Sequence, residues 1–343
     1  MTTSCADTIP VKTVLLTRQD VAALLSIDEC IVAVEEAFRL HAQGRTLPPG
    51  VLGMPSKDGG FHIKAAGLRQ ERTWFAVKCN GNFPGNPRRG LPTIQGIVVL
   101  CDAGDGQVLA VMDSMEITSL RTAAATALAA RYLAREDAHV ATICGCGLQG
   151  RAQLLALARV RALARVFAFD VEPSRAERFA SEMKEMDLEV EAVSDLQAAT
   201  RASDIIVTCT TAKSFILGYE DVRPGTFVAG VGADNADKQE LDPRLLASAT
   251  VVVDSLEQCA AIGDLHHAIA GGHMTTADVH AELADLVIGS KQGRTRLDEI
   301  AVFDSTGVAL EDVGAAAAVY RRAVATGSGL RLDFLNRQDG SMD

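Results

Sequence analysis

The feature that most constrains this chain is a glycine-rich turn directly after an apolar run. His139–Cys144 has the character of a buried strand, and it leads into the sequence GCGLQG at residues 145–150. In such a strand–turn–helix unit, the first glycine permits the tight turn, the second lets the backbone approach a pyrophosphate, and the third lets the helix pack on the strand. The turn therefore predicts a dinucleotide site with Gly145, Gly147 and Gly150 at the cofactor, where the helix N-terminus supplies N–H donors.

A carboxylate at the end of the next strand indicates which dinucleotide is bound. The apolar run Val166–Asp170 ends at Asp170, 20 positions after Gly150, where an acidic residue binds the ribose hydroxyls of NAD. The same charge repels a 2′-phosphate, so NAD is expected rather than NADP. Two alternatives stay open: Arg175 lies nearby and would soften this preference, and Asp170 would also serve as a plain turn or helix-capping residue.

Strand and helix patterns alternate through the middle of the chain. The helical patterns are Gln149–Val160 and Ser174–Met186, and the strand-like runs are Asp204–Cys209, Thr226–Val231 and Val251–Asp254. Such alternation implies a mostly parallel sheet covered by helices on both faces. With 343 residues the chain is long enough for two domains. We therefore expect an α/β fold, a doubly wound parallel sheet of the Rossmann type, with a second, smaller domain.

The first hundred residues have a different pattern, which predicts that smaller domain. A short strand is expected at 14–17, Thr17 caps a helix at 22–25, and a second helix covers Ile27–His41. Runs broken by Gly and Pro then predict the strands Gly60–Ala66, Trp74–Cys79 and Thr93–Cys101. Further helices are predicted from Ile117 through an alanine-rich run, and over Thr276–Ile288 and Val308–Ala325. Strands and helices that are segregated in this way are typical of an α+β domain.

Composition excludes several classes of function. The formal net charge of −11 argues against a nucleic-acid surface, which needs clustered Lys and Arg. The N-terminal segment MTTSCADTIPVKTVLL is polar where a signal peptide is apolar, and no run of about 18 apolar residues predicts a membrane span. The eight cysteines are irregularly spaced in a chain that needs no disulfides, so we expect reduced thiols and a cytoplasmic protein.

One aspartate is placed for acid–base chemistry. The strand Thr226–Val231 runs into GADNADKQELD, which puts Asp234 at the carboxyl edge of the sheet, with Lys238 four residues later. Ligands of doubly wound sheets bind at that edge, and a carboxylate there can serve an amine or an attacking water as general acid or base. The competing interpretation is a loop aspartate that caps the next turn.

Three cations are candidates for binding an anionic substrate. Lys78 lies within the apolar run WFAVKCNG, where an unpaired lysine would be costly. Arg121 opens the alanine-rich helix, and a helix N-terminus with a guanidinium makes an anion site. For Lys64, in FHIKAAG, a solvated strand face is the better interpretation.

Metal and hydrolase chemistry find no support. His266 and His267 have only Glu257 and Asp264 as neighbouring ligands in the sequence, so surface or inter-subunit histidines are the better interpretation. The DAGDG segment at 102–106 lacks the later ligands of a calcium loop and predicts a tight turn. No GxSxG or HExxH motif is present.

Together these segments resemble the ornithine cyclodeaminase and mu-crystallin family over nearly the whole chain. The most specific matches are GNP with GLPT (Gly85–Thr93), SLRTAAATALAARYLAR (Ser119–Arg135), GCGLQGRAQ, GADNADKQELD and FDSTG (Phe303–Gly307). The resemblance implies a homodimer. It also implies an NAD-binding Rossmann domain over 119–306 and a substrate-binding and dimerisation domain formed by 1–118 together with 307–343.

The resemblance also implies roles for individual residues. Asp234 would be the proton donor and acceptor, with Lys78 as its catalytic partner at the substrate carboxylate or carbonyl. The side chains expected around the substrate are His62, Lys64, Lys78, Arg121 and Thr306. The residues expected around NAD are Thr93, Arg121, Gly145, Gly147, Leu148, Gln149, Gly150, Asp170, Thr210, Val231, Lys238 and Ser305.

Members of this family differ in chemistry, which leaves three hypotheses. The glycine turn and GADNADKQELD are most similar to those of the alanine dehydrogenase and ketimine reductase type, which implies an NAD-dependent oxidoreductase acting on the α-carbon of a small amino acid or its imine. The first rival is an ornithine or lysine cyclodeaminase, which uses NAD catalytically and releases ammonia. The second is a non-catalytic nucleotide and ligand binder of the mu-crystallin kind.

Overall fold

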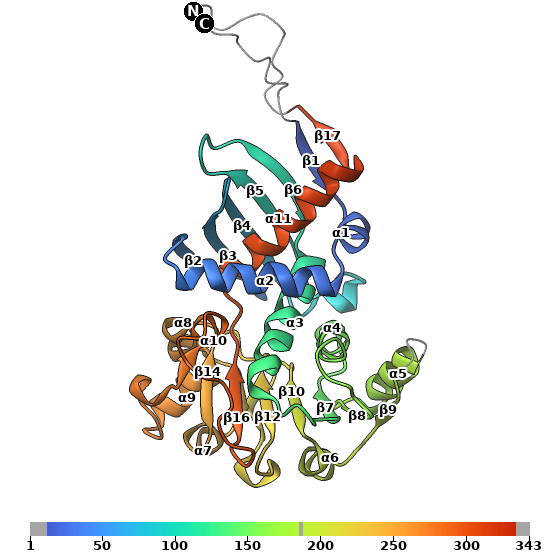
Figure 1. Cartoon of the computed structure of the whole chain (residues 1–343). Coiled ribbons are helices and arrows are strands. Elements are labelled where there is room, and N and C mark those ends of the chain that lie inside the picture. The colour runs from blue at the N-terminus through green and yellow to red at the C-terminus, as the bar shows by residue number, and fades with distance from the viewer. Residues whose placement is uncertain (1–11, 185–187, 334–343) are drawn as a thin grey trace, which may run out of the picture.

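Two large β-sheets dominate the molecule. The structure, a computed structural model, describes residues 12–184 and 188–333. Within these residues it contains a seven-stranded sheet, an eight-stranded sheet and a two-stranded ribbon of β11 (Lys213–Leu217) and β13 (Gln239–Leu241). The seven-stranded sheet lies above the eight-stranded one in Figure 1, and the long helix α3 (Ser114–Leu133) passes between them.

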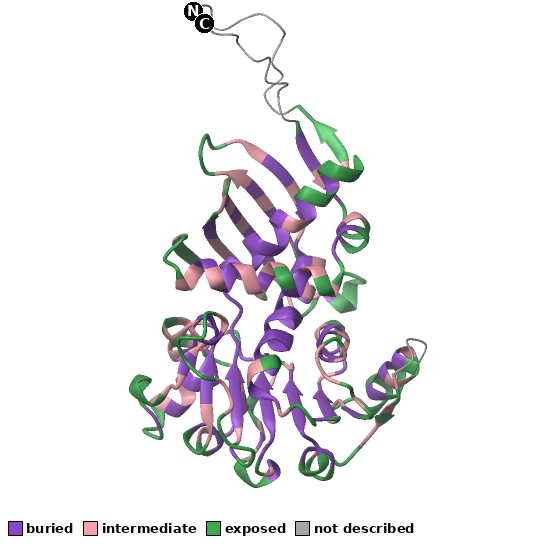
Figure 2. Cartoon of the chain, viewed as in Figure 1, coloured by how far each residue is buried: buried purple, intermediate pink, exposed green. Residues whose placement is uncertain are grey.

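The eight-stranded sheet is parallel and doubly wound. Its order is β15-β14-β16-β12-β10-β7-β8-β9, and its first strand in sequence, β7, has later strands on both sides, which confirms the Rossmann expectation. The central strands are almost fully buried (Figure 2). The strands are β7 (Val140–Cys144), β8 (Arg165–Phe169), β9 (Val190–Ala192), β10 (Ile205–Thr208), β12 (Phe227–Gly230), β14 (Thr250–Val253), β15 (Ala281–Glu282) and β16 (Ala301–Asp304).

Short helices connect these strands. They are α4 (Leu148–Leu157), α5 (Pro173–Lys184), α6 (Leu196–Ala202), α7 (Pro243–Ala247), α8 (Leu256–Ile262), α9 (Asp264–Ala270) and α10 (Leu283–Val287), with the 3-10 turns η2 (Tyr219–Asp221) and η3 (Thr276–Asp278). The single helix expected over Thr276–Ile288 is wrong. His280 donates its amide to the carbonyl of Val251, and β15 then pairs with β14, so strand pairing interrupts the helical pattern.

The seven-stranded sheet has the order β17-β1-β6-β5-β4-β3-β2 and is antiparallel except where β1 pairs with β6. Its strands are β1 (Thr13–Leu16), β2 (Thr46–Ser56), β3 (Gly59–Arg69), β4 (Thr73–Asn82), β5 (Ile94–Asp102), β6 (Val108–Asp113) and β17 (Leu330–Leu332). The sequence did not predict β2, because Pro48 and Pro49 argue against a strand. β2 tolerates both prolines because it is the edge strand.

Helices cover one face of this sheet (Figure 1). They are α1 (Arg18–Leu24), α2 (Ile27–Ala42) and α11 (Ala309–Thr326), and α11 packs on β3, β4 and β5. Thr17 caps α1 as predicted, through a capping box with Asp20. On β5, Val98 points toward the helices and is fully buried, whereas the neighbouring Ile97 is 46% exposed on the opposite face. That opposite face has no helix of the described residues over it (Figure 1).

The molecule has two halves, one built on the seven-stranded sheet and one on the parallel sheet. The chain crosses between them at α3 and again between β16 and α11. Fourteen residues of α3 are buried, and six of them are alanines, whose small side chains allow close packing against α2, α4 and α11. The expected boundaries at 118 and 306 fall within α3 and within the second crossing; that division of the chain stays a prediction. In the described part of the chain, no helix is long and apolar enough to cross a membrane, and seven cysteines are free; Cys5 lies outside it.

Candidate functional site

The glycine turn has the shape that a dinucleotide requires. Gly145 has φ +103°, and a Cβ there would lie 2.8 Å from the carbonyl oxygen of Cys209. A Cβ on Gly150 would lie 2.2 Å from the carbonyl oxygen of Gly145, so helix and turn are in direct contact. At Gly147, by contrast, a Cβ would meet nothing within 4 Å. The tight turn, the close helix contact and the open approach therefore lie at the three positions predicted for them.

The N-terminus of α4 is free to receive an anion. Its N-cap, Gly147, provides no side-chain hydrogen bond, so the first N–H groups of the helix have no side-chain cap. Leu148 is 41% exposed beside the turn, and Nε2 of Gln149 is buried without a hydrogen-bond partner among the described residues. Free helix donors next to an open glycine fit the pyrophosphate of a dinucleotide.

Asp170 lies against the glycine turn, directly after β8. Its Oδ2 accepts a hydrogen bond from the amide of Cys146 at 3.0 Å, and its Oδ1 accepts one from the amide of Glu172 at 3.0 Å. The nearby Arg175 forms an ion pair with Glu172, 2.7 Å away. The carboxylate therefore lies where a ribose would follow the pyrophosphate, and its nearest arginine in sequence has another partner.

Asp234 and Lys238 meet at the carboxyl edge of the parallel sheet. Nζ of Lys238 donates to Oδ1 of Asp234 at 2.6 Å. The side chain of Asp234 is 47% exposed, because it opens into the space between the two halves. Burial in this space raises the pKa of Asp234, but Lys238, Lys64 and His62 outweigh it and hold that pKa below its usual value. The carboxylate is therefore ionised and surrounded by cations.

Two lysines lie side by side on the helix-covered face of the seven-stranded sheet, which is called the upper sheet below. The register pairs Lys64 of β3 directly with Lys78 of β4. Lys78 is 4% exposed and contacts Asp312 of α11 at 2.8 Å. Nζ of Lys64 donates to the carbonyls of Gly307 at 2.7 Å and Thr306 at 3.2 Å. Burial lowers the pKa of both lysines, that of Lys78 to about 8.

Arg121 completes a buried charge cluster with α11. Its Nη1 donates to Glu311 at 2.8 Å, and its Nε lies 3.1 Å from Asp312. Burial raises the pKa of Glu311 to about 7. For Asp312, burial also raises the pKa, but Lys78 and Arg121 outweigh it, so that pKa lies below the usual value.

Two expectations need correction here. Arg121 does not lie at a helix N-terminus, because Asp113 accepts from the amides of Met115 and Glu116 and starts α3 at Ser114. Glu311 and Asp312 were missed altogether. Two adjacent acids shortly after FDSTG are the only local sign of them, and this sign does not reveal their partners, which come from β4 and α3.

The connection from β16 to α11 carries Ser305 and Thr306. Both hydroxyls donate to Asp254, at the end of β14, at 3.1 Å, and the amide of Gly307 donates to it at 2.6 Å. Gln258 donates to Thr306 at 2.8 Å. The hydroxyl and amide groups of this crossing therefore donate to Asp254, while its carbonyl groups at Thr306 and Gly307 accept from Lys64.

Thr210 and Val231 follow β10 and β12 at the same edge. The amide of Val231 donates to the carbonyl of Thr208, and the amide of Thr210 donates to the carboxylate of Glu240. Thr93 lies just before β5, whose first residue, Ile94, pairs with Asn82 at the end of β4. The structure thus places Thr210 and Val231 at the carboxyl edge of the parallel sheet, and Thr93 at one end of the upper sheet.

A cavity of about 790 Å³ opens between the β2–β3 hairpin and the parallel sheet. It is bounded by both halves of the molecule, and its polar lining residues are His62, Asn82, Lys213, Asn235 and Asp237. Asn235 follows Asp234 directly in the chain, so the cavity lies beside the cation-rich edge. Its size suits a small substrate with the end of a cofactor.

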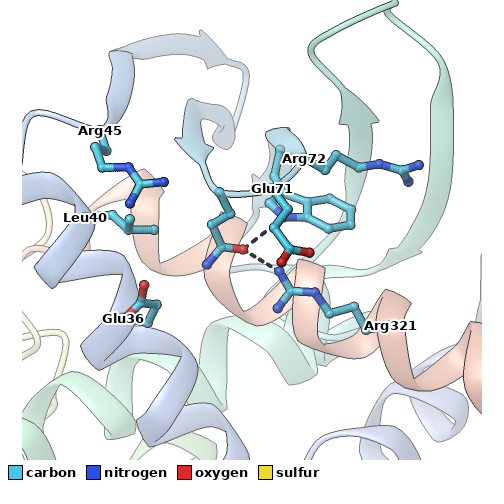
Figure 3. Close-up of a pocket in the computed structure, with 8 residues that line it drawn as sticks. Glu36, Leu40, Arg45, Glu71, Arg72 and Arg321 are labelled. Carbon is cyan, nitrogen blue, oxygen red and sulfur yellow. Dashed lines mark hydrogen bonds between the residues drawn. The ribbon is translucent and has the colours of Figure 1, made fainter.

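A second hollow, of about 400 Å³, is lined by a different set of residues (Figure 3). It lies between α2 and the C-terminal part of α11, and Arg72 and Arg321 approach the ring of Trp74 at 5.4 and 5.1 Å. None of the expected site residues lines it.

The two neighbouring histidines have local partners. His267 bonds the carbonyl of Lys238 at 2.8 Å, and His266 bonds that of Ala260 at 3.2 Å. Over residues 12–184 and 188–333, no group of three His, Cys, Asp or Glu side chains is arranged to hold a metal ion.

Comparison with known proteins gives this geometry its context. An archaeal alanine dehydrogenase, solved as a dimer with bound NAD, superposes with a TM-score of 0.90 at 38% identity, over 94% of this chain and 100% of that one. The Δ1-pyrroline-2-carboxylate reductase of Thermococcus litoralis, with NADH and L-proline, gives 0.89 at 34% identity, over 93% and 99%. The iminosuccinate reductase of Paracoccus denitrificans, with NAD+, gives 0.87 at 31% identity, over 94% and 100%.

A family model also matches residues 11–327, which is nearly the whole described chain. With relatives this similar along their full lengths, the chain belongs to the ornithine cyclodeaminase/mu-crystallin family.

Proposed function

We propose that this protein is an NAD-dependent oxidoreductase that acts on the α-carbon of a small amino acid or its imine. The observation that carries the proposal is an ionised carboxylate, Asp234, that faces a group of cations beside an open dinucleotide turn. A carboxylate manages a proton, the cations bind an anionic substrate, and the turn holds a redox cofactor. The relatives support the same chemistry, since they are named as an alanine dehydrogenase and two imine reductases.

The cofactor would be NAD, held by the turn and by Asp170. The N–H groups at the start of α4 would bind the pyrophosphate, and Asp170 would accept hydrogen bonds from the ribose. A 2′-phosphate would meet this carboxylate, and Arg175 is already paired with Glu172. When bound, NAD supplies or accepts a hydride.

The substrate carboxylate would bind the cations of the upper sheet. Lys78 and Arg121 are fixed by Asp312 and Glu311, so their positions are set before the substrate arrives. Lys64 has no carboxylate within salt-bridge distance among the described residues; its ammonium donates to backbone carbonyls, which a substrate carboxylate would replace or join. His62, on the cavity wall, and Thr306, at the crossing, would face the rest of the substrate.

Asp234 would handle the proton of the reaction. Because its pKa lies below the usual value, it is a base at neutral pH. In the oxidative direction it would accept a proton from the water that attacks the imine carbon, and ammonia would leave. In the reductive direction the same proton would return as water is expelled and the imine forms. Lys238, hydrogen-bonded to it, would orient the carboxylate.

We further propose that two chains associate through the uncovered face of the upper sheet. Apolar side chains from successive strands form a row across this face, as the register shows: Leu52, Ile63, Cys79 and Ile97. An apolar row on a sheet face without a covering helix is typical of a surface that binds another chain. We propose that the resulting assembly is a homodimer. The cytoplasmic location and the domain division given above are kept as separate parts of the proposal.

The proposal is tested by following NADH absorbance with purified protein. The panel would hold pyruvate, glyoxylate and oxaloacetate, each with ammonium or methylamine, and cyclic ketimine carboxylates. Loss of one NADH per product with one member would support the reductase. Release of ammonia from L-ornithine or L-lysine with only catalytic NAD would instead identify a cyclodeaminase. Silence in both assays would contradict the proposal and favour a binding protein.

A further inference from the structure

A buried glutamate lies beneath the site and joins two of its loops. Glu240, on β13, is 0% exposed. Its Oε2 accepts from the hydroxyl of Thr208 at 2.9 Å and from the amide of Gly232 at 2.7 Å, and its Oε1 accepts from the amide of Thr210 at 2.5 Å. One carboxylate thereby ties together the segments that follow β10 and β12.

These two segments are pressed together so closely that only glycine fits at position 232. A Cβ there would lie 2.4 Å from the carbonyl oxygen of Thr210 and 2.5 Å from Cδ of Glu240. The carbonyl of Gly232 in turn accepts from the amide of Asp234 at 3.1 Å. The hydrogen bonds of Glu240 are therefore only two residues from the carboxylate that would carry the proton.

The backbone of Glu240 is fixed by a second buried carboxylate. The amides of Glu240 and Leu241 both donate to Oδ1 of Asp264, at 2.8 and 2.9 Å, which fixes the backbone of β13. Among the described residues, no Lys, Arg or His forms an ion pair with Glu240. A buried carboxylate without a cation costs stability, so this residue is poorly explained as a device for stability alone.

We propose that Glu240 is a positioning residue, which holds the Thr210 and Gly232 segments where the nicotinamide end of the cofactor and the carboxylate of Asp234 must meet. It touches neither substrate nor cofactor and acts through these two backbone segments. This inference rests on the proposed function, because that function gives the edge of the sheet its cofactor and Asp234 its role.

The test is Glu240→Gln, which keeps the size of the side chain but replaces one carboxylate oxygen by an NH2 group. This group is a donor and cannot accept the hydrogen bonds that the oxygen accepted. The matched control is Glu299→Gln. Glu299 is also buried and accepts from the amides of Thr295 and Arg296, but it precedes β16 and so lies at the opposite edge of the sheet. Both substitutions remove a buried carboxylate that binds backbone amides, and only one does so beneath the site.

Two readouts separate positioning from folding. The first is kcat per NADH-binding site, which is independent of the folded fraction. In Glu240→Gln it should fall at least about tenfold, because small misplacements of reacting groups are costly. In Glu299→Gln it should stay near the wild-type value. The second is binding of NADH compared with ADP-ribose, which lacks the nicotinamide. Glu240→Gln should weaken NADH several-fold and leave ADP-ribose unchanged.

Equal kcat per site in wild type and Glu240→Gln would overturn the inference, and so would an equal loss in Glu299→Gln. If Glu240→Gln does not fold, Thr208→Val removes one hydrogen bond of the same carboxylate and must change both readouts in the same direction, or the inference is wrong. If the wild-type protein turns over no substrate, the proposed function fails. The comparison of NADH with ADP-ribose then still decides the inference, because unchanged relative affinity would contradict it.

Discussion

Asp234 lies among cations, and this environment determines both its charge and its use. Lys238 donates to it at 2.6 Å, and Lys64 and His62 add to the positive potential. We expect Asp234→Asn to lower turnover by ~10²–10⁴-fold, the range of a lost acid–base group. NADH binding, measured by fluorescence titration, should remain intact. Near-normal turnover would remove Asp234 from the mechanism.

Lys78 predicts a pH dependence of substrate binding. Its pKa is lowered to about 8 by burial, so the ammonium is present below pH 8 and is lost as the pH rises through this value. The KM for an anionic substrate should therefore rise above about pH 8. Lys78→Arg keeps the charge at alkaline pH, because arginine does not deprotonate. In that variant the alkaline rise in KM should disappear, and its persistence would assign the effect to another group.

The polar residues of the site illustrate what a sequence can and cannot reveal. Asp234 and Asp170 were predictable because each lies at or shortly after the end of an apolar strand, at the edge where ligands bind. Glu240 and Asp312 were not, because their importance comes from partners at other positions in the chain. A charge cluster that joins β4, α3 and α11 has no local pattern.

At the scale of elements, the glycine turn offers a matched pair of substitutions. In Gly150→Ala, the added Cβ would meet the carbonyl oxygen of Gly145 at 2.2 Å, so α4 must shift and the melting temperature should fall. In Gly147→Ala, the Cβ enters empty space, so the fold should tolerate it. That space is where the pyrophosphate would approach, so NADH affinity should fall in Gly147→Ala at nearly unchanged melting temperature.

The melting temperature and the NADH affinity of both variants can be measured in one series of thermal melts with and without NADH. If Gly147→Ala binds NADH as wild type does, the pyrophosphate does not lie against this glycine. If Gly150→Ala melts as wild type does, the contact between helix and turn is looser than the geometry indicates.

Regular elements were predictable wherever one local signal dominated. The capping box at Thr17, the glycine turn and the buried strands of the parallel sheet all follow from short stretches of sequence. β2 was not predictable, because its prolines are acceptable only at an edge, and only the assembled sheet reveals which strand is the edge. The helix expected over Thr276–Ile288 failed for the same reason, since pairing of β15 with β14 overrode the local pattern.

For the whole molecule, the upper sheet predicts the assembly state. Ile97 lies on its uncovered face and is 46% exposed in the single chain. If this face joins two chains, Ile97→Asp should bury a charge at the interface and shift the protein toward monomer. Light scattering after gel filtration would measure the mass.

Leu297 provides the control for that experiment. It is 77% exposed, and it belongs to the parallel-sheet half rather than to the uncovered face. Leu297→Asp should leave the mass unchanged. A dimer that survives Ile97→Asp would place the interface elsewhere.

The chain has one tryptophan, Trp74, and it lies beside the second hollow, between Arg72 and Arg321 and against Tyr320. This packing makes it an intrinsic fluorescent reporter for the seven-stranded half alone. If NADH binds at the glycine turn as proposed, its emission would report on that turn, in the parallel-sheet half. The two emissions would then follow different parts of the molecule, and a denaturation followed at both wavelengths would reveal whether the two halves unfold together or one after the other.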